Sequence, residues 1–352
     1  MLIVFYLGYS PNFNNENFKN QDVAKNIGGS EYAALYLSNE MAKLGHEVHV
    51  FGFGITEENS RYHHASKLSD FCMTREIDAL IISRYINAFL HCQIRAKKIY
   101  VWVHDIIVHS AYNGQHLPSN AGVLLHNLLG CIDGISAQGN WHEAVLGELY
   151  PFAREKIFKA PNGIDSEIFD MALTSSRKKI PNTFVWAAHH SRGLVKMMEL
   201  WSAILAEIPD AKLFIYGDST DETKIQLEAF LRKNSSSVML KGKVPHTKLF
   251  EKMLEVDYWV YPTEFSETFC MIALEAQLAG CKCVCSKLAG LVDTVGDYGI
   301  LLDNASSTPQ MWVSSILEMK TRPEEFYINM RNHAAAQTWA SRAEDWISRI
   351  SM

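Results

Sequence analysis

Short apolar runs and longer amphipathic stretches alternate along the chain, which is the pattern of strands and helices that follow one another. A strand, a helix and a second strand in this order form a βαβ unit, and βαβ units build parallel sheets. In the first half the predicted strands are 2–7, 47–51, 79–83, 98–103, 132–136 and 157–160, and the predicted helices are 30–44, 88–97, 120–129 and 141–150. The first half therefore predicts a Rossmann-like domain.

The same alternation begins again in the second half. Its predicted strands are 183–188, 212–216, 238–240, 257–261, 282–285 and 300–302, and its predicted helices are 194–207, 222–233, 247–255, 268–279, 309–320, 323–337 and 341–350. A break near Thr338 and Trp339 would let the last helix return to the first domain. The stretch 166–182 is polar and bounded by proline, which is typical of a hinge linker. We expect two Rossmann-like domains, 1–165 with a final helix at about 339–352, and 166–338.

Composition narrows the class of protein. At 352 residues the chain exceeds one typical hydrophobic core, and 48% hydrophobic with 20% charged residues is the composition of a folded globular protein. The formal net charge of -6 argues against broad binding to nucleic acid. The apolar start lacks a signal-peptide pattern, and no segment approaches the ~18 uncharged apolar residues of a membrane span. We expect a cytoplasmic protein without a transmembrane segment, for which peripheral membrane contact stays open.

The seven cysteines show no disulfide framework, which favours a reducing compartment and free thiols. Cys281, Cys283 and Cys285 cluster, so a metal site is one interpretation. Alternation at period two puts all three on one face of a short strand, and no second Cys or His pair at finger-like spacing accompanies them. Buried core thiols are therefore favoured, and we expect no metal site.

Glycines and polar residues stand where predicted strands of the first half end. A loop rich in asparagine, 10–26, precedes Gly28 and Gly29, and it is either disordered or a substrate lid. The two glycines let the backbone approach a ligand, Ser30 can cap the next helix, and the N–H groups of that helix start attract an anion. His104 follows a strand directly, where open α/β sheets bind ligands. The alternatives are an ordinary turn and a histidine satisfied inside the fold.

Basic residues occupy two turns of the second half. Arg192 lies before the predicted helix 194–207 and can donate two parallel hydrogen bonds to a diphosphate, while Lys196 just inside that helix offers a second positive charge. Lys243 and Val244 follow a glycine at a strand end, where the backbone can approach a flat base. Ordinary solvated charge is the alternative for each cation.

Two acids flank the start of the predicted helix 268–279. If that helix begins near Thr268, its first N–H groups attract an anion such as a phosphate. With a helix from Glu267 to Glu275, the two Cα atoms would be roughly 12 Å apart, so that the carboxylates could hold different parts of one extended ligand. Two surface acids beside a helix start are the alternative.

The chain lacks a G-x-G-x-x-G fingerprint after its first strand, so a nicotinamide or flavin enzyme is not supported. The sequence instead resembles the family-4-type class of retaining glycosyltransferases with the GT-B fold. The signature of that class is a Glu, seven residues and a second Glu, here Glu267 and Glu275. Further matches in the family's order are Gly28-Gly29-Ser30-Glu31, Asn162-Gly163-Ile164-Asp165, Arg192-Gly193-Leu194, Gly242-Lys243-Val244-Pro245 and Ala289-Gly290-Leu291-Val292-Asp293-Thr294-Val295.

This resemblance implies two Rossmann-like domains that face each other across a cleft, with a nucleotide-diphosphate sugar held mainly by the second. No cofactor or metal is required. The catalytic residues it implies are Glu267 and His104 near the transferred sugar and Arg192 at the diphosphate. The further donor-binding residues it implies are Gly28 and Gly29 at the diphosphate, Phe269, Cys270 and Met271 near the sugar, Glu275 at the ribose, and Lys243 and Val244 around the base. Lys196 is a candidate for a second cation at the diphosphate by its proximity to Arg192, and not by the resemblance.

The implied reaction is retaining transfer of a hexose to a hydroxyl of a glycan or of a lipid- or protein-linked sugar. GDP-mannose is favoured over UDP-glucose and UDP-GlcNAc as donor, without a decisive residue. Two departures stand out, because the family's Gly-Phe-Gly is here Thr268-Phe269-Cys270, and Trp186 occupies the place of a second diphosphate-binding Arg. The alternatives are a nucleotide-sugar epimerase or phosphorylase on the same fold, and a nucleotide-sugar-binding protein without catalysis.

Overall fold

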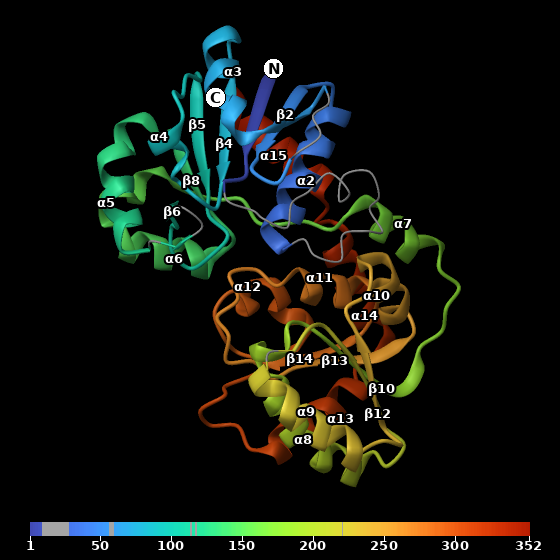
Figure 1. Cartoon of the computed structure of the whole chain (residues 1–352). Helices are drawn as coiled ribbons and strands as arrows, with labels where there is room; N and C mark the ends of the chain where they lie inside the picture. The colour runs from blue at the N-terminus through green and yellow to red at the C-terminus, as the bar shows by residue number, and fades with distance from the viewer. Residues whose placement is uncertain (9–27, 56–59, 113–114, 117, 220) are drawn as a thin grey trace. The chain divides into compact units, whose positions relative to one another are not determined.

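The computed structural model describes residues 1–8, 28–55, 60–112, 115–116, 118–219 and 221–352. The chain divides into two compact units, Met1–Gly163 with Trp339–Met352, and Ile164–Thr338. Each unit contains one parallel β-sheet with helices around it (Figure 1). The predicted class, an α/β protein with two Rossmann-like domains, is confirmed.

The first unit is built on a sheet in the order β3-β2-β1-β4-β5-β8-β9, and all its strand pairs are parallel. Apolar side chains cover both faces of its central strands, as a parallel sheet between helices requires. The elements are β1 (Leu2–Tyr6), α2 (Gly29–Lys43), β2 (Glu47–Gly52), β3 (Tyr62–His64), α3 (Leu68–Thr74), β4 (Ala79–Ser83), α4 (Ala88–His91), β5 (Lys98–Trp102), β6 (Ala111–Tyr112), β7 (Gln115–His116), α5 (Pro118–Leu128), β8 (Gly134–Ala137), α6 (Asn140–Leu149), β9 (Ile157–Lys159) and α15 (Trp339–Ser351).

The second unit repeats the plan with the order β12-β11-β10-β13-β14-β15. Helices α8, α9 and α13 lie on one side of this sheet, and α10, α11, α12 and α14 lie on the other (Figure 1). The elements are α7 (Ser166–Thr174), β10 (Ile180–Ala187), α8 (Leu194–Glu207), β11 (Lys212–Tyr216), α9 (Asp221–Lys233), β12 (Val238–Gly242), α10 (His246–Met253), β13 (Val256–Tyr261), α11 (Met271–Leu278), β14 (Lys282–Ser286), α12 (Leu291–Val295), β15 (Ile300–Leu302), α13 (Pro309–Lys320) and α14 (Glu324–Ala335).

The strand order reverses direction once in each sheet, between β1 and β4 in the first unit and between β10 and β13 in the second. Open α/β sheets bind ligands outside the carboxyl ends of their strands at such a switch point, because the connecting loops there turn to opposite faces and leave a crevice. Each unit therefore has one edge at which a ligand site is expected.

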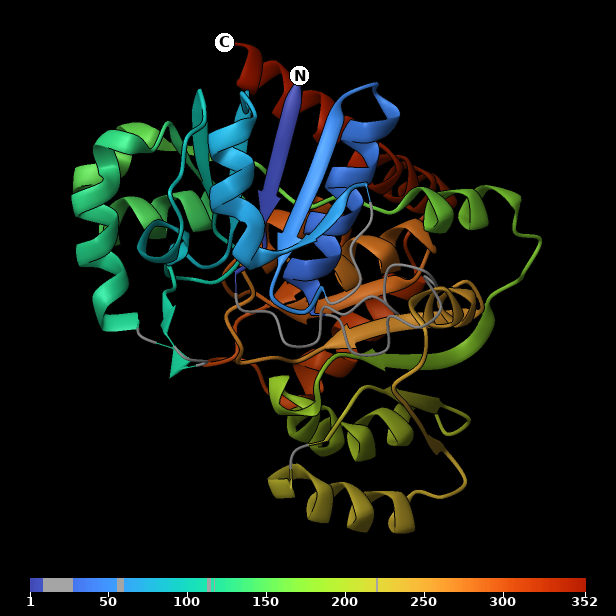
Figure 2. The ribbon, with the colours of Figure 1, turned by 45° about the horizontal axis from the view of Figure 1, so that its top comes forward.

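The C-terminal helix α15 belongs to the first unit, where it lies beside α2 (Figure 1). Trp346 packs its ring 5.8 Å from the ring of Trp102 on β5, and Trp339 packs 6.2 Å from the same ring. All three side chains are buried, and such burial contributes roughly 2–3 kcal/mol per side chain. Both chain ends lie at one edge of this unit (Figure 2), where Ser351 Oγ is 4.0 Å from Met1 Sδ.

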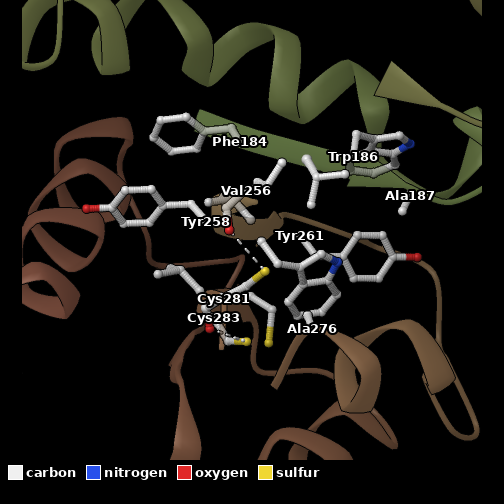
Figure 3. Packing of buried hydrophobic residues seen from close by; sticks show 14 of the residues in the cluster. Phe184, Trp186, Ala187, Val256, Tyr258, Tyr261, Ala276, Cys281 and Cys283 are labelled. Atoms are coloured by element: carbon white, nitrogen blue, oxygen red, sulfur yellow. Dashed lines mark hydrogen bonds between the residues drawn. The ribbon is translucent and has the colours of Figure 1, made fainter. Parts of the chain in front are cut away.

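Aromatic rings and thiols fill the core of the second unit (Figure 3). Phe184 stacks on Tyr258 with ring centroids 4.7 Å apart, and Trp186 packs 5.2 Å from Tyr261. The thiols of Cys281, Cys283 and Cys285 are completely buried in this core. The period-two alternation thus correctly predicted buried cysteines, of which Cys283 and Cys285 lie in β14 and Cys281 directly precedes it.

Several predictions about local structure are wrong. The expected linker contains a helix, α7, because Asp165 accepts a hydrogen bond from the Glu167 amide at its start and Ile168 is buried in the core. The expected helix 88–97 stops after one turn, because Cys92 is extended and the Gln93 amide donates to Ser69 Oγ instead of continuing the helix.

The helix that carries Glu275 begins at Met271 and not near Thr268. The Glu267 carbonyl accepts a hydrogen bond from the Gly290 amide at 2.8 Å, and the Thr263 amide donates to Ser286 Oγ at 2.9 Å. These contacts hold the segment as a loop against β14, so Glu267 lies outside the helix. The 12 Å estimate, which assumed a continuous helix, does not apply.

Candidate functional site

Arg192 ends a short 3-10 turn, η5 (His190–Arg192), which follows the carboxyl end of β10. The next residue, Gly193, has a φ of +119°, and a Cβ there would lie 2.6 Å from the Pro262 carbonyl oxygen. Only glycine fits this position without strain. The Thr263 hydroxyl also donates to the Arg192 carbonyl, so the loops after β10 and β13 are fastened together.

Glu267 is buried and held by two partners. Nη1 of Arg192 lies 2.9 and 3.0 Å from its two carboxylate oxygens, and the Tyr261 hydroxyl donates to Oε1 at 2.8 Å. Burial, reinforced by the Glu267 carboxylate, raises the pKa of Tyr261, so the phenol keeps its proton and remains a donor. Gly290 is required behind this loop, because a Cβ there would lie 2.2 Å from the Thr268 carbonyl oxygen.

Glu275 lies in α11, is 4% exposed, and uses its two oxygens differently. Its Oε1 is 2.8 Å from His246 Nε2. Its Oε2 is buried and makes no hydrogen bond within the part of the chain that the structure describes. A buried carboxylate oxygen without a partner is costly, and a ligand hydroxyl is a suitable donor for it.

The residues between the two acids lie at the first turn of α11. Cys270 is the N-cap of that helix and Met271 its first residue, and no side chain caps the helix start. Cys270 is buried, and burial and the Glu267 carboxylate raise the pKa of its thiol. Phe269 is half-buried against the core. The thiol is therefore neutral, and it adds volume next to Glu267.

The two lysines predicted to bind the nucleotide sugar, Lys196 and Lys243, are each paired with an acid. Lys196 Nζ is 2.6 Å from the exposed Glu264 carboxylate, and Lys243 Nζ is 3.7 Å from that of Asp218. Val244 is half-buried after Gly242, whose φ of +66° turns the chain away from β12. The structure brings Arg192 and Glu267 into direct contact but shows no contact of Lys196 or Lys243 with either.

Trp186 cannot substitute for a second cation. It is buried, and its indole N–H donates to the Ala188 carbonyl at 3.0 Å. Phe265 instead adds to the surroundings of Arg192, whose guanidinium carbon lies 4.3 Å from the centre of its ring. Such a cation–π contact holds the guanidinium in place.

In the first unit His104 stands after β5, beside β4 and β8. Its Nε2 is 3.1 Å from Ser83 Oγ, its Nδ1 is 3.5 Å from Gln138 Nε2, and its ring packs 4.5 Å from that of Trp102. Burial lowers the pKa of His104 to about 3. Since an amide nitrogen can only donate, Nδ1 accepts and Nε2 carries the proton of the neutral ring.

Charged and neutral neighbours surround this histidine. Arg84 Nε donates to Asp105 Oδ2 at 2.7 Å, and Arg84 has a φ of +68°, an unusual conformation for a non-glycine residue. His142 is completely buried and accepts the Gln138 amide at its Nδ1, and burial lowers the pKa of His142 to about 4. Both histidines are neutral hydrogen-bonding groups near pH 7.

Gly28 and Gly29 begin α2, as the N-cap and the first residue. Ser30 does not cap the helix, contrary to expectation, because its hydroxyl donates to Glu31 Oε2 at 2.8 Å. The loop 10–26, with its alternatives of disorder or a lid, lies outside the described residues.

Sequence reasoning missed three residues that contact the predicted ones, Tyr261, His246 and Phe265. The available signals were a tyrosine at the last position of a strand, a histidine at a helix start three residues after Lys243, and an aromatic ring between two acids. Across the described ranges, His, Cys, Asp and Glu side chains nowhere gather in threes that could hold a metal ion. No helix within those ranges is long and apolar enough to cross a membrane.

Solved structures define the class of this fold. Anabaena HepE, solved in complex with UDP, superimposes with a TM-score of 0.72 and 13% sequence identity over 99% of both chains. The fold is accordingly GT-B, an architecture of two parallel α/β domains. Residues 172–337, which lie within the second unit, match the family model described as "Glycosyl transferases group 1".

Curated relatives match a smaller part of the chain at higher sequence identity. Over 197 residues the chain is 24% identical to one component of the phosphatidylinositol N-acetylglucosaminyltransferase of Arabidopsis thaliana, and this match covers 54% of the chain and 43% of the relative. Over 224 residues it is 26% identical to D-inositol 3-phosphate glycosyltransferase of Stackebrandtia nassauensis, and this match covers 57% of the chain and 50% of the relative. The matches therefore span half or less of each relative's length. Both relatives are named for glycosyl transfer, as is the family model that matches the second unit.

Proposed function

We propose that this chain is a retaining glycosyltransferase that moves a hexose from a nucleotide-diphosphate sugar to a hydroxyl of a glycan or of a lipid- or protein-linked sugar. The observation that carries the proposal is a pair of buried carboxylates at the switch point of the second unit. Glu267 is already fixed by Arg192 and Tyr261, and Glu275 presents a buried oxygen without a partner in the described residues. Such an arrangement suits a polyhydroxylated ligand.

The donor contacts that we propose follow from these environments. Glu275 accepts from a ribose hydroxyl and Glu267 from the sugar, while Arg192 and Lys196 neutralise the diphosphate. The backbone N–H groups around Phe269, Cys270 and Met271 lie at a helix start, whose dipole favours an anionic or electron-rich group. The base would lie against the backbone at Lys243 and Val244.

Bond cleavage between the sugar and the diphosphate develops negative charge on the leaving phosphate, so fixed positive groups are the main requirement. Arg192 is such a group, since Glu267 and Phe265 hold its guanidinium in one place. The hydrogen bonds that engage both Glu267 oxygens argue against a covalent nucleophile. The acceptor oxygen would therefore attack the face from which the phosphate leaves, and the acceptor proton would pass to a phosphate oxygen.

For the first unit we propose that neutral His104 hydrogen-bonds the transferred sugar and that the Gly28 and Gly29 backbone approaches the diphosphate. A ring with a pKa near 3 carries no charge at pH 7. It can therefore bind a hydroxyl without competing for the phosphate.

The decisive experiment is calorimetry of Glu275→Ala with nucleotide sugars. Loss of a buried charged hydrogen bond costs about 2 kcal/mol, so the affinity should fall about 30-fold. GDP-mannose is the first donor to test, with UDP-glucose and UDP-GlcNAc as the second arm because the HepE structure holds UDP. Glu318→Ala, an exposed acid on α13, is the control. Unchanged affinity in Glu275→Ala would remove the ribose assignment.

Product analysis separates this proposal from its alternatives. An epimerase converts the donor without an acceptor, and a phosphorylase needs only phosphate. Buried Trp186 supplies no second cation for the diphosphate. This residue therefore favours a third alternative, a protein that binds a nucleotide sugar without turnover. Transfer to an acceptor sugar with retention at the anomeric carbon is the expected outcome.

A further inference from the structure

His246 and Glu275 come from different helices and meet inside the second unit. His246 is the first residue of α10, Glu275 lies in α11, and Nε2 and Oε1 are 2.8 Å apart. The pairing occupies one carboxylate oxygen and leaves the other, Oε2, buried without a hydrogen bond in the described residues. The orientation of Glu275 thus depends on a side chain that is not one of the predicted donor-binding residues.

Three acids face this histidine. Glu275 contacts it directly from α11, and Asp165 and Glu167 act on it from the start of α7, which packs against α10. Burial by itself would lower the pKa of His246, but the attraction of Glu275, Asp165 and Glu167 outweighs burial and raises the pKa above its usual value. His246 therefore carries positive charge over a wider pH range than a free histidine does.

We propose that His246 is a positioning residue for ribonucleotide recognition: it holds Oε1 of Glu275 and keeps that carboxylate charged, so that Oε2 accepts a hydrogen bond from a ribose hydroxyl. This inference rests on the proposed function, because it assumes that Glu275 binds the ribose. The new element is that Glu275 binds the ribose as a pair with His246.

The physical reason is the cost of a buried charge. A carboxylate in a protein interior that loses its cationic partner takes up a proton more readily, and like charges nearby strengthen that tendency. Without a cation at position 246, the positive charge that faces Glu275, Asp165 and Glu167 would be lost. A protonated Glu275 is a weaker acceptor for a ribose hydroxyl, so protons and nucleotide would then compete.

The test is the pH dependence of UDP and GDP affinity in His246→Gln, whose amide can still donate a hydrogen bond but carries no charge. We expect wild-type affinity to be nearly constant between about pH 5.5 and 8.5, whereas His246→Gln binds within about threefold of wild type at pH 8.5 and about tenfold more weakly at pH 5.5. Lys248→Gln is the matched control, because it removes an exposed charge from the same helix. A His246→Gln profile parallel to that of wild type would overturn the proposal.

Glu275→Gln separates this inference from the proposed function. If Glu275→Gln leaves nucleotide affinity unchanged, the ribose assignment itself fails. If Glu275→Gln weakens binding while His246→Gln matches wild type at every pH, only the role of His246 fails. The double variant should bind like Glu275→Gln alone, because His246 is expected to act through Glu275.

A second measurement needs no change at His246. The NMR titration midpoint of the His246 ring should fall in Glu275→Gln, since its main stabilising charge is removed. An unchanged midpoint would show that the two residues are not coupled and would overturn the proposal even if His246→Gln failed to fold.

Discussion

Both units contain a parallel sheet whose strand order reverses once, but the histidines that follow their strands, His104 and His246, shift in pKa in opposite directions. In the first unit, burial lowers the pKa of His104 to about 3, and Arg84 and His142 act in the same direction. In the second unit, the acids around His246 outweigh burial and raise its pKa. The same residue type therefore supplies a neutral hydrogen-bonding group in one unit and a positive charge in the other. The charge of the neighbours, and not the fold, decides which.

This difference has opposite consequences for stability. A histidine with a lowered pKa in the folded state resists protonation, so its contribution is present above the unfolded pKa of about 6.5 and is lost as the pH falls below it. A histidine with a raised pKa contributes below 6.5, and that contribution is lost as the pH rises through the folded value. Acid should therefore weaken the first unit through His104 and His142, while His246 stabilises the second unit in acid.

The largest expected effect is on His104→Ala. If His104 hydrogen-bonds the transferred sugar, as proposed, its loss should lower kcat about 100-fold while the affinity for the nucleotide sugar stays nearly unchanged. Assays of transfer and of donor binding on the same protein would separate the two quantities. His126→Ala, an exposed histidine of the same unit, is the control. Full turnover in His104→Ala would remove this residue from the proposed site.

Between pH 7 and pH 5, His142 should lower the free energy of unfolding of the first unit by about 2 kcal/mol, because burial lowers the pKa of this side chain to about 4. Hydrogen exchange of the β5 and β8 amides at pH 7 and pH 5 reports the stability of the first unit separately from that of the second. In His142→Asn, whose side-chain oxygen can still accept the Gln138 amide, the loss of stability between these pH values should shrink by that amount. An identical loss in wild type and variant would contradict the assignment.

The smallest effect is expected for Tyr261→Phe, which removes one hydrogen bond from Glu267 but leaves Arg192 in place. That change should cost about 1 kcal/mol, or roughly a fivefold lower kcat, with nucleotide affinity unchanged. Tyr258→Phe is a matched control on the same strand, because its buried hydroxyl has no hydrogen-bond partner within the described residues. Equal effects of the two variants would indicate loss of packing and not of Glu267 positioning.

Periodicity along the chain predicted most elements, in several cases to the residue, as for β4, β11, α8 and α13. It did so because alternation and helical spacing depend on near neighbours in sequence. It failed where distant contacts overrule local preference. The start of α11 is delayed because Gly290 and Ser286, which follow it in sequence, bind the backbone of the preceding loop.

The candidate site divides in the same way. The sequence by itself determined that Arg192, Glu267 and His104 follow strands and that Glu275 lies within the next helix, and the spacing of the two acids carried the resemblance to glycosyltransferases. Only the tertiary structure decided that Arg192 and Tyr261 hold Glu267 and that His246 holds Glu275. Those pairings join separate elements, and the protonation of each group depends on burial and on charges brought close by folding, which no local pattern encodes.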